Sequence, residues 1–233
     1  MNHMLKWYTI PEFEYIEPKS SYHKELEPVE REEFSIENLH VLVRAHYYVC
    51  KHNEDNRKNE MEQKGAEESK EKVEVCDGEE LKNRKCILRI SADDYYKLYV
   101  NGAFVAQGPA PSYIEKYYYN EIDISPFLKG GDNVIACHLY YQGVINRVYN
   151  SGDGRFGVGA EIVEENASKS SYLSFKYKIS NAFRGDLTGY QVQFLENFDS
   201  RLWREDWNLL DFEDSSWEEM CEAPWVDYTF CKQ

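Results

Sequence analysis

The class of fold is indicated most directly by residues 95–107, Tyr95-Tyr-Lys-Leu-Tyr-Val-Asn-Gly-Ala-Phe-Val-Ala-Gln107. Asn101-Gly102 divides it into two short runs, and this dipeptide favours a β-hairpin because both central residues of a type I′ turn need a positive φ. In the first run, Tyr96, Leu98 and Val100 share one face, as the two-residue period of a half-buried strand requires. The stretch therefore predicts two antiparallel strands joined by a tight turn.

Further strand-like stretches lie on both sides of this hairpin. From Leu39 to Val49 every second residue is apolar or aromatic, which predicts a strand with one buried face. The remaining predicted strands are residues 86–91, 117–124, 133–141, 156–163, 172–179 and a closing strand near 220–226. Roughly nine short strands with turns between them, and no long helix, predict an all-β jelly-roll β-sandwich in a single domain over residues 34–228.

The two ends of the chain and one internal segment depart from this pattern. Residues 1–33 are rich in Glu, Pro and aromatic residues without a clean period, and we expect an extended arm there; residues 229–233 are expected to begin a linker. Residues 51–85 contain 11 acidic and 9 basic residues. Because so charged a segment cannot offset its ordering entropy by burial, we expect a solvated, flexible insertion; a charged interaction tail is the alternative.

Composition and cysteine spacing narrow the class of protein. A net charge of −15 argues against nucleic acid as a partner, because phosphate binding needs clustered Lys and Arg. The sequence has neither a signal peptide nor an apolar run near the roughly 18 residues of a membrane helix. The six cysteines have no paired spacing, so we expect mostly free thiols and a cytoplasmic location, with Cys50 and Cys86 as the one pair placed to face each other.

Motifs that would identify a catalytic site are absent from the sequence. It contains no G-x-S-x-G, H-E-x-x-H, C-x-x-C or G-x-x-x-x-G-K-[ST] pattern. A pair of carboxylates for sugar hydrolysis cannot be selected from 42 acidic residues, because their separation in space is the criterion. We expect no cofactor; a Ca²⁺ ion in a loop rich in Asp and Asn is the alternative.

Several stretches resemble the N-terminal domain of bacterial α-L-rhamnosidases. They are Leu39–Arg44, Ala92–Gly102, Gln107–Pro111, Tyr117–Asp123, Gly131–Ala136, Tyr140–Arg147, Ser151–Asp153, Phe194–Asp199 and Asp214–Trp217. The resemblance covers about residues 38–50 and 86–228. It implies a galactose-binding-domain-like jelly roll that is attached, in the family, to a larger (α/α)6 barrel with the catalytic carboxylates. Since no such barrel can be drawn from this sequence, we expect a fragment that is inactive alone.

The resemblance leaves two functions open. The chain is either a non-catalytic module of a rhamnosidase-like glycoside hydrolase, which packs on and shapes the remaining domains of the same polypeptide, or an autonomous carbohydrate-binding module. A binding module would stack exposed Tyr and Trp rings on sugars and bind hydroxyls through Asp, Asn and Arg side chains. Its ligands would be rhamnose-containing glycosides, and neither nucleic acid nor a membrane is an expected partner.

Two polar segments, residues 146–155 and 196–201, are not explained by any strand pattern. Long Gly-rich loops usually persist for function or for a defined contact. Their Arg and carboxylate side chains suit charge-assisted hydrogen bonds, either with one another or across an interface. We expect both segments at one end of the sandwich, facing the catalytic domain. The candidate residues for carbohydrate binding or domain docking are Tyr140, Tyr141, Asn146, Arg147, Asn150, Asp153, Arg155, Glu196, Asp199, Arg201 and Trp203.

Overall fold

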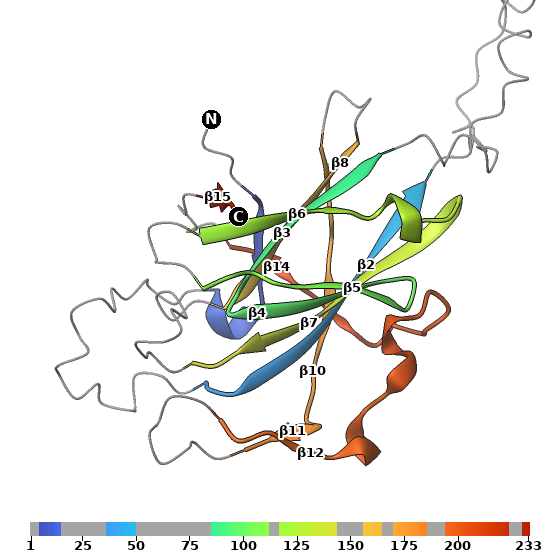
Figure 1. The fold of residues 1–233 in the computed structure, drawn as a ribbon. Helices are drawn as coiled ribbons and strands as arrows, with labels where there is room; N and C mark the ends of the chain where they lie inside the picture. The colour runs from blue at the N-terminus through green and yellow to red at the C-terminus, as the bar shows by residue number, and fades with distance from the viewer. Residues whose placement is uncertain are drawn as a thin grey trace, which may run out of the picture.

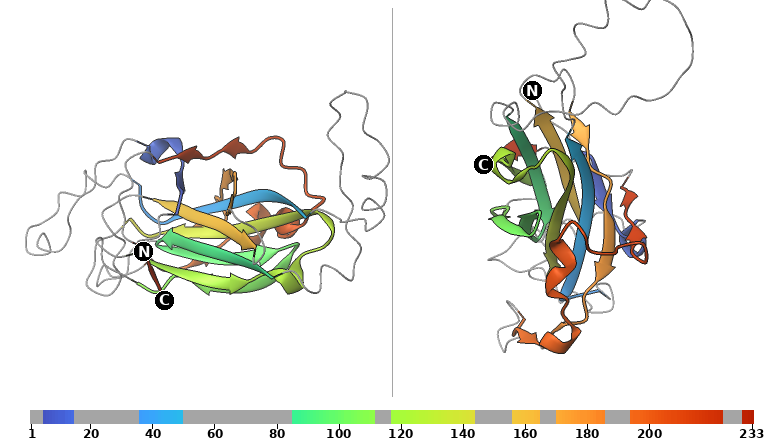
Figure 2. Two further views of the ribbon diagram at one scale, coloured as in Figure 1. Left: turned by 90° about the horizontal axis from the view of Figure 1, so that it is seen from above. Right: turned by 90° about the vertical axis from the view of Figure 1, so that its right-hand side faces the viewer.

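A computed structural model describes residues 5–14, 36–49, 85–111, 117–143, 156–164, 170–185, 194–223 and 230–233. Two β-sheets face each other as the two layers of a sandwich (Figures 1 and 2). The helices of the described residues are all short 3-10 turns: η1 (Pro11–Phe13), η5 (Ser125–Phe127), η6 (Ser200–Leu202) and η7 (Glu205–Asn208). The predicted all-β sandwich is therefore confirmed.

The first layer is a six-stranded antiparallel sheet. Its order is β13 (Glu218–Glu219), β10 (Lys176–Ile179), β2 (Leu39–Val49), β7 (Gly131–Tyr141), β4 (Tyr95–Val100) and β5 (Ala103–Gly108). The long strands β2 and β7 pair along their full lengths, from Leu39 opposite Tyr141 to Val49 opposite Gly131. They form the centre of this layer.

The second layer contains seven strands. Its order is β14 (Cys221–Glu222), β1 (Trp7–Thr9), β8 (Gly157–Glu164), β3 (Cys86–Asp93), β6 (Tyr117–Asp123) and β15 (Phe230–Lys232), and β9 (Ser171–Tyr172) also pairs with β8. A separate two-stranded ribbon joins β11 (Phe183–Arg184) to β12 (Asn197–Phe198). Figure 1 shows the β11–β12 ribbon below the six-stranded layer.

Alternating apolar residues of the two layers form the core. Val41 and Val43 of β2 and Leu98 of β4 are fully buried, and they face Leu88 and Ile90 of β3. Their neighbours along each strand point to the outer faces, because successive side chains of a strand alternate. The core thus follows directly from the two-residue period of the sequence.

The Asn101-Gly102 turn has the predicted geometry. Both residues have a positive φ, 49° and 84°, and they connect β4 to β5. The Asn101 side chain also donates to the backbone oxygen of Phe127 at 2.9 Å, and its Oδ1 accepts from the backbone N–H of Val134 at 3.0 Å. The turn is therefore tied to the neighbouring strand β7 as well as to its own hairpin.

The ends of the chain differ from their expected roles. Residues 7–9, expected in an arm, form β1 between β8 and β14, and the side chains of Ile10 and Phe13 lie in the core. Residues 230–232, expected at the start of a linker, form β15 in parallel pairing with β6. Residues 1–4 and 15–33 of the predicted arm and nearly all of the predicted insertion, residues 51–84, lie outside the described residues.

Two further predictions concern cysteines and membranes. Cys86, Cys137, Cys221 and Cys231 are free thiols, while Cys50 and Cys76 lie outside the described residues. None of the helices in the described parts of the chain has the length and apolar character that crossing a membrane requires.

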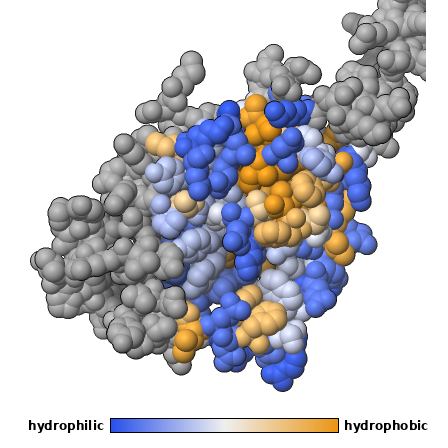
Figure 3. Space-filling view, viewed as in Figure 1, coloured by the Kyte–Doolittle hydropathy of each residue, from blue (hydrophilic) through white to orange (hydrophobic). Residues whose placement is uncertain are grey.

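One part of the surface is apolar. Figure 3 shows hydrophobic residues gathered to the right of centre, over β5 and β6, among hydrophilic neighbours. Phe104 of β5 is 55% exposed, and Val105 and Ile122 are only partly buried against the core. This is the side on which the edge strand β5 and the strand β6 leave the sandwich open.

Candidate functional site

The outer face of the six-stranded sheet is partly covered by the segment that follows β12. Trp207 and Trp217 of this segment pack on Leu42, Val134 and Ala136 of strands β2 and β7. A second, smaller apolar cluster is thereby buried on the side of the sheet opposite to the core. This segment, residues 199–217, is called the covering segment below. It directly follows β12 and so connects the β11–β12 ribbon to the packed tryptophans.

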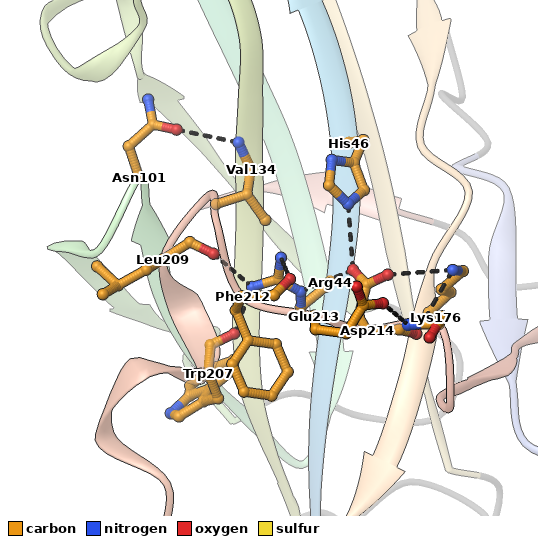
Figure 4. Close-up of polar contacts among 11 residues, drawn as sticks. Arg44, His46, Asn101, Val134, Lys176, Trp207, Leu209, Phe212, Glu213 and Asp214 are labelled. Atoms are coloured by element: carbon orange, nitrogen blue, oxygen red, sulfur yellow. Dashed lines mark hydrogen bonds and ion pairs between the residues drawn. The ribbon is translucent and has the colours of Figure 1, made fainter.

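Arg44 is the polar centre of this covered face (Figure 4). Its side chain is fully buried, and its Nε donates to Asp214 Oδ2 at 2.9 Å. The terminal nitrogens donate to the backbone oxygens of Trp207, Leu209 and Phe212. A buried guanidinium is tolerated only when its charge is paired and its N–H groups are bound, and the covering segment supplies both.

Asp214 completes the cluster from the covering segment. It also binds Lys176 Nζ and His46 Nε2, each at 3.1 Å. Burial disfavours the charged carboxylate, but the hydrogen bonds from Arg44, Lys176 and His46 outweigh that effect and lower the pKa of Asp214 to about 2. Asp214 therefore holds its charge, and the covering segment is fastened to strands β2 and β10.

Next to the covered area, a pocket with a volume of about 640 Å³ opens at one end of the six-stranded sheet and reaches Asn120 of β6 in the other layer. It lies beside the ends of β2, β4, β5 and β7 and is closed on one side by residues of the ribbon. The lining residues that matter for its chemistry are Asn38, His40, Tyr95, Lys97, Gln107, His138, Tyr140, Phe183, Arg184, Phe194 and Glu196.

A row of stacked rings crosses one wall of the pocket. Tyr95 and Tyr140 are cross-strand partners of β4 and β7, with ring centroids 6.4 Å apart. Tyr140 stacks on His40 at 4.4 Å, and His40 stacks on Phe183 of the ribbon at 4.0 Å. The row therefore joins three strands of the sheet to β11.

Two histidines form a buried pair at the base of this row. His40 Nδ1 and His138 Nε2 are 3.0 Å apart, so that one nitrogen donates a hydrogen bond to the other. Burial, together with the positive charge of Lys97, lowers the pKa of His40 to about 4. Burial, His40 and Lys97 lower the pKa of His138 to about 3. Both rings are therefore neutral near pH 7, and one of them accepts the N–H of the other.

Acidic groups surround the Tyr140 hydroxyl. Burial and the negative charges of Asp94 and Glu196 raise the pKa of Tyr140 to about 12. Asp94 itself is buried, which raises its pKa to about 6 although its Oδ2 accepts from the backbone N–H of Gln142 at 2.7 Å. Tyr140 is thus a neutral hydrogen-bonding group with acidic neighbours.

The predicted site residues are brought together only in part. Tyr140 and Glu196 both line the pocket. Trp203 lies half-buried in the ring cluster, 5.6 Å from His138 and 5.5 Å from Phe183. Asn146, Arg147, Asn150, Asp153 and Arg155 lie outside the described residues.

Tyr141, Asp199 and Arg201 are placed differently. Tyr141 is 1% exposed and packs in the core against Phe13 and Phe156, so the prediction that it supplies a surface contact was wrong. Its position follows from alternation, because neighbouring residues of a strand cannot share a face. Asp199 accepts from Arg201 at 2.6 Å within its own turn, on the exposed part of the segment.

Sequence reasoning missed His40, His138 and Phe183. The histidines occupy outward positions of strands expected to face solvent, and only the register of β2 against β7 brings them together. The alternating pattern gave the direction of both side chains. The pattern could not predict that the ribbon, which begins more than 40 residues after His138, covers both histidines.

The described residues show no metal centre. Within these ranges, no three His, Cys, Asp or Glu side chains gather in a group that could hold a metal ion.

The arrangement of the chain is similar to that of known glycoside hydrolases. It is similar to the GH78 family rhamnosidase of Bacillus sp. GL1 (21% identity, TM-score 0.66), to which 100% of this chain and 20% of that chain align. The α-L-rhamnosidase of Dictyoglumus thermophilum is also similar, with 17% identity and a TM-score of 0.58; 98% of this chain aligns to 22% of that chain. For the α-L-rhamnosidase of Aspergillus terreus the identity is 15% and the TM-score 0.60, and 99% of this chain aligns to 22% of that chain. At these identities the likeness shows a common fold, and the chain spans about one fifth of the length of these relatives. A comparison with curated protein sequences gives no match.

The sequence itself gives the family. The family model of the α-L-rhamnosidase N-terminal domain matches residues 82–233, well over half of the chain. The chain belongs to the α-L-rhamnosidase N-terminal domain family.

Proposed function

We propose that this chain acts as the accessory N-terminal β-sandwich of an α-L-rhamnosidase-like glycoside hydrolase. In that role it packs on the catalytic part of a longer polypeptide and helps to shape it. The proposal is supported by the family and by the share of about one fifth that the chain covers of its structural relatives. The catalytic carboxylates would then belong to the remainder of the polypeptide.

The observation that carries the docking role is a stretch of chain with several exposed apolar side chains, residues 195–209, which we call the strip. Leu195, Phe198, Leu202 and Leu209 are between 40% and 59% exposed within 15 residues of chain. Grouped exposed apolar side chains mark interaction surfaces. The strip overlaps the predicted docking segment 196–201, where Asp199 and Arg201 supply a polar rim.

The test compares the 233-residue chain with a polypeptide that continues into the catalytic part. The 233-residue chain should not hydrolyse an aryl α-L-rhamnoside, and the longer polypeptide should. Leu202→Asp in the longer polypeptide should lower its activity or its Tm, because the apolar contact is lost, while the Tm of the 233-residue chain stays the same.

Tyr172→Asp is the matched control, because Tyr172 is equally exposed but lies on the seven-stranded sheet. Equal effects of Leu202→Asp and Tyr172→Asp would refute docking through the strip. Turnover by the 233-residue chain itself would refute the accessory role.

The cytoplasmic location is also part of this proposal. It is supported by the four described cysteines, which are all free thiols. Mass analysis of the alkylated protein without reduction tests it, and two or more disulfides would contradict it.

A further inference from the structure

The pocket beside the β11–β12 ribbon has the dimensions of a small-molecule site. Its volume of about 640 Å³ lies within the range of about 300–1,000 Å³ that such sites occupy. Most of its wall belongs to paired strands, where the register of Tyr95 opposite Tyr140 fixes the spacing of side chains. The lining is therefore held in place before a ligand arrives, which reduces the entropic cost of binding.

Aromatic rings give the pocket an apolar wall. Tyr95, Tyr140 and Phe183 belong to the stacked row, and Phe194 approaches from the ribbon side. Ordered rings offer a large contact area at little cost in side-chain entropy. The C–H groups on one face of a sugar ring are suited to such a wall.

Polar side chains occupy much of the remaining lining, beside Gly108, Pro109, Ala110 and Leu195. Asn38 and Gln107 each carry an amide that both donates and accepts, Glu196 accepts, and Lys97 and Arg184 donate. Donors and acceptors placed around an apolar wall match the alternating hydroxyl groups of a carbohydrate. They match a ligand of uniform character, such as a hydrocarbon chain, much less well.

The charges around the pocket favour a neutral ligand. Lys97 and Arg184 are opposed by Glu196 in the lining and by Asp94 behind Tyr140. An anionic ligand would be repelled by the two carboxylates, and a cationic ligand would be repelled by the two basic groups. The electrostatic potential of the pocket therefore favours neither charge. A neutral, hydroxyl-rich ring experiences no such penalty.

We propose that this pocket binds a single neutral sugar ring, with its apolar face against Tyr95 at the end of the row that Tyr140 supports, and its hydroxyls at Glu196, Gln107 and Asn38. The inference goes beyond the accessory role, because the pocket belongs to this chain alone. It adds direct recognition of a glycosyl unit to a domain that otherwise only supports its neighbours.

Titration calorimetry on the 233-residue chain tests the proposal, with L-rhamnose and D-glucose as neutral sugars and inorganic phosphate as an anionic probe. At least one sugar should bind with a Kd on the order of 1 mM. Tyr140→Ala should weaken binding about tenfold or more, because it removes the centre of the ring wall. Saturation-transfer NMR should show the strongest transfer to the C–H protons of one sugar face.

Two exposed lining residues guard against a folding defect in Tyr140→Ala. Glu196→Gln and Gln107→Ala should each weaken sugar binding several-fold with an unchanged circular dichroism spectrum. Tyr172→Ala, on the other sheet, is the matched control and should bind like the wild type.

Three outcomes would overturn the inference. They are no saturable sugar binding at tens of millimolar, binding of phosphate in place of sugar, and equal losses in Tyr140→Ala and Tyr172→Ala. None of these outcomes bears on the docking proposal, which is tested by the activity of the longer polypeptide. Conversely, failure of Leu202→Asp to affect that polypeptide would leave sugar binding by this chain intact.

Discussion

Arg44 of β2 forms an ion pair with Asp214 at 2.9 Å beneath the covering segment, with its side chain fully buried. The alternation of residues 39–49 correctly places its side chain on the outer face of β2, away from Val43 and Ala45. It could not reveal that this position is buried, because the acceptor Asp214 lies 170 residues further along the chain. An Arg on the outer face of a strand would ordinarily be solvated. Only the folded covering segment turns it into a buried ion pair.

Loss of the Asp214 carboxylate should therefore destabilise the protein strongly. Asp214→Ala leaves the Arg44 guanidinium buried without its counterion, and the free energy of unfolding should fall by about 3 kcal/mol or more. Urea denaturation followed by tryptophan fluorescence measures the change. The matched control is Asp206→Ala, which breaks an exposed pair with Arg204 at 2.7 Å and should have no detectable effect. Similar losses in both variants would contradict the role assigned to Arg44.

Local sequence patterns correctly predicted the long strands but did not predict the short strands β1 and β15. β2, β4, β7 and the hairpin follow from alternation and from the Asn101-Gly102 turn, which are properties of neighbouring residues. β1 and β15 have only three residues each, too few to show a period, and they exist because distant strands pair with them. The predicted strand at 172–179 is interrupted, since β9 joins one sheet and β10 the other.

The hairpin turn should not tolerate a side chain at Gly102. Its φ of 84° is strained for other residues, and an added Cβ would lie 2.5 Å from Leu209 Cδ2. Gly102→Ala should lower the free energy of unfolding by about 1–2 kcal/mol. The double variant Gly102→Ala/Leu209→Ala removes the clash and leaves the backbone strain. If Gly102→Ala alone has no effect on thermal or urea unfolding, the turn geometry described for β4–β5 is incorrect.

The ribbon contact should weaken in acid. Because the pKa values of His40 and His138 lie below 6.5 in the folded state, the unfolded chain binds more protons between about pH 6.5 and pH 3. The free energy of unfolding contributed by this pair is thus fully present above pH 6.5 and falls as the pH drops. The loss should reach on the order of 3 kcal/mol for each histidine by about pH 4.

A variant without the two imidazoles isolates this effect from the titration of carboxylates. His40→Asn/His138→Asn should be less stable than the wild type near neutrality but should lose less stability between about pH 7 and pH 4. Urea midpoints at several pH values provide the comparison. Parallel pH profiles for the two proteins would exclude the histidine pair as the acid-sensitive element.

For the whole molecule, the sequence predicted the class of fold and part of the candidate site. Many short alternating strands are compatible with few architectures, so the sandwich could be inferred, but the order of strands in each sheet depends on pairings that no local pattern contains. The pocket was only half anticipated, through Tyr140 and Glu196. Its other rings are outward strand residues that look like ordinary solvated positions until β11 and β12 are placed over them.

The two ends of the chain should differ in their importance for the fold. Deletion of residues 1–10 removes β1 from between β8 and β14, together with the buried Trp7 and Ile10, and should leave mostly insoluble protein. Deletion of residues 230–233 removes only the edge strand β15 and should reduce Tm while the protein stays soluble. Soluble yield and near-ultraviolet circular dichroism distinguish the two. If both deletions gave the same soluble yield, β1 would contribute no more to the stability of the fold than the edge strand β15 does.

The position of β1 between β14 and β8 also has a consequence for biosynthesis. Thr9 pairs with Cys221, so β1 meets this partner only after 212 further residues have been made. At about 5–20 residues per second, this interval lasts roughly 10–40 s. Until its other partner β8 has been made, the nascent chain carries the unpaired, Trp-bearing strand β1, which is a natural target for chaperones. The seven-stranded sheet is therefore completed late, near the end of translation of this domain, whereas the hairpin at Asn101-Gly102 can close as soon as it emerges.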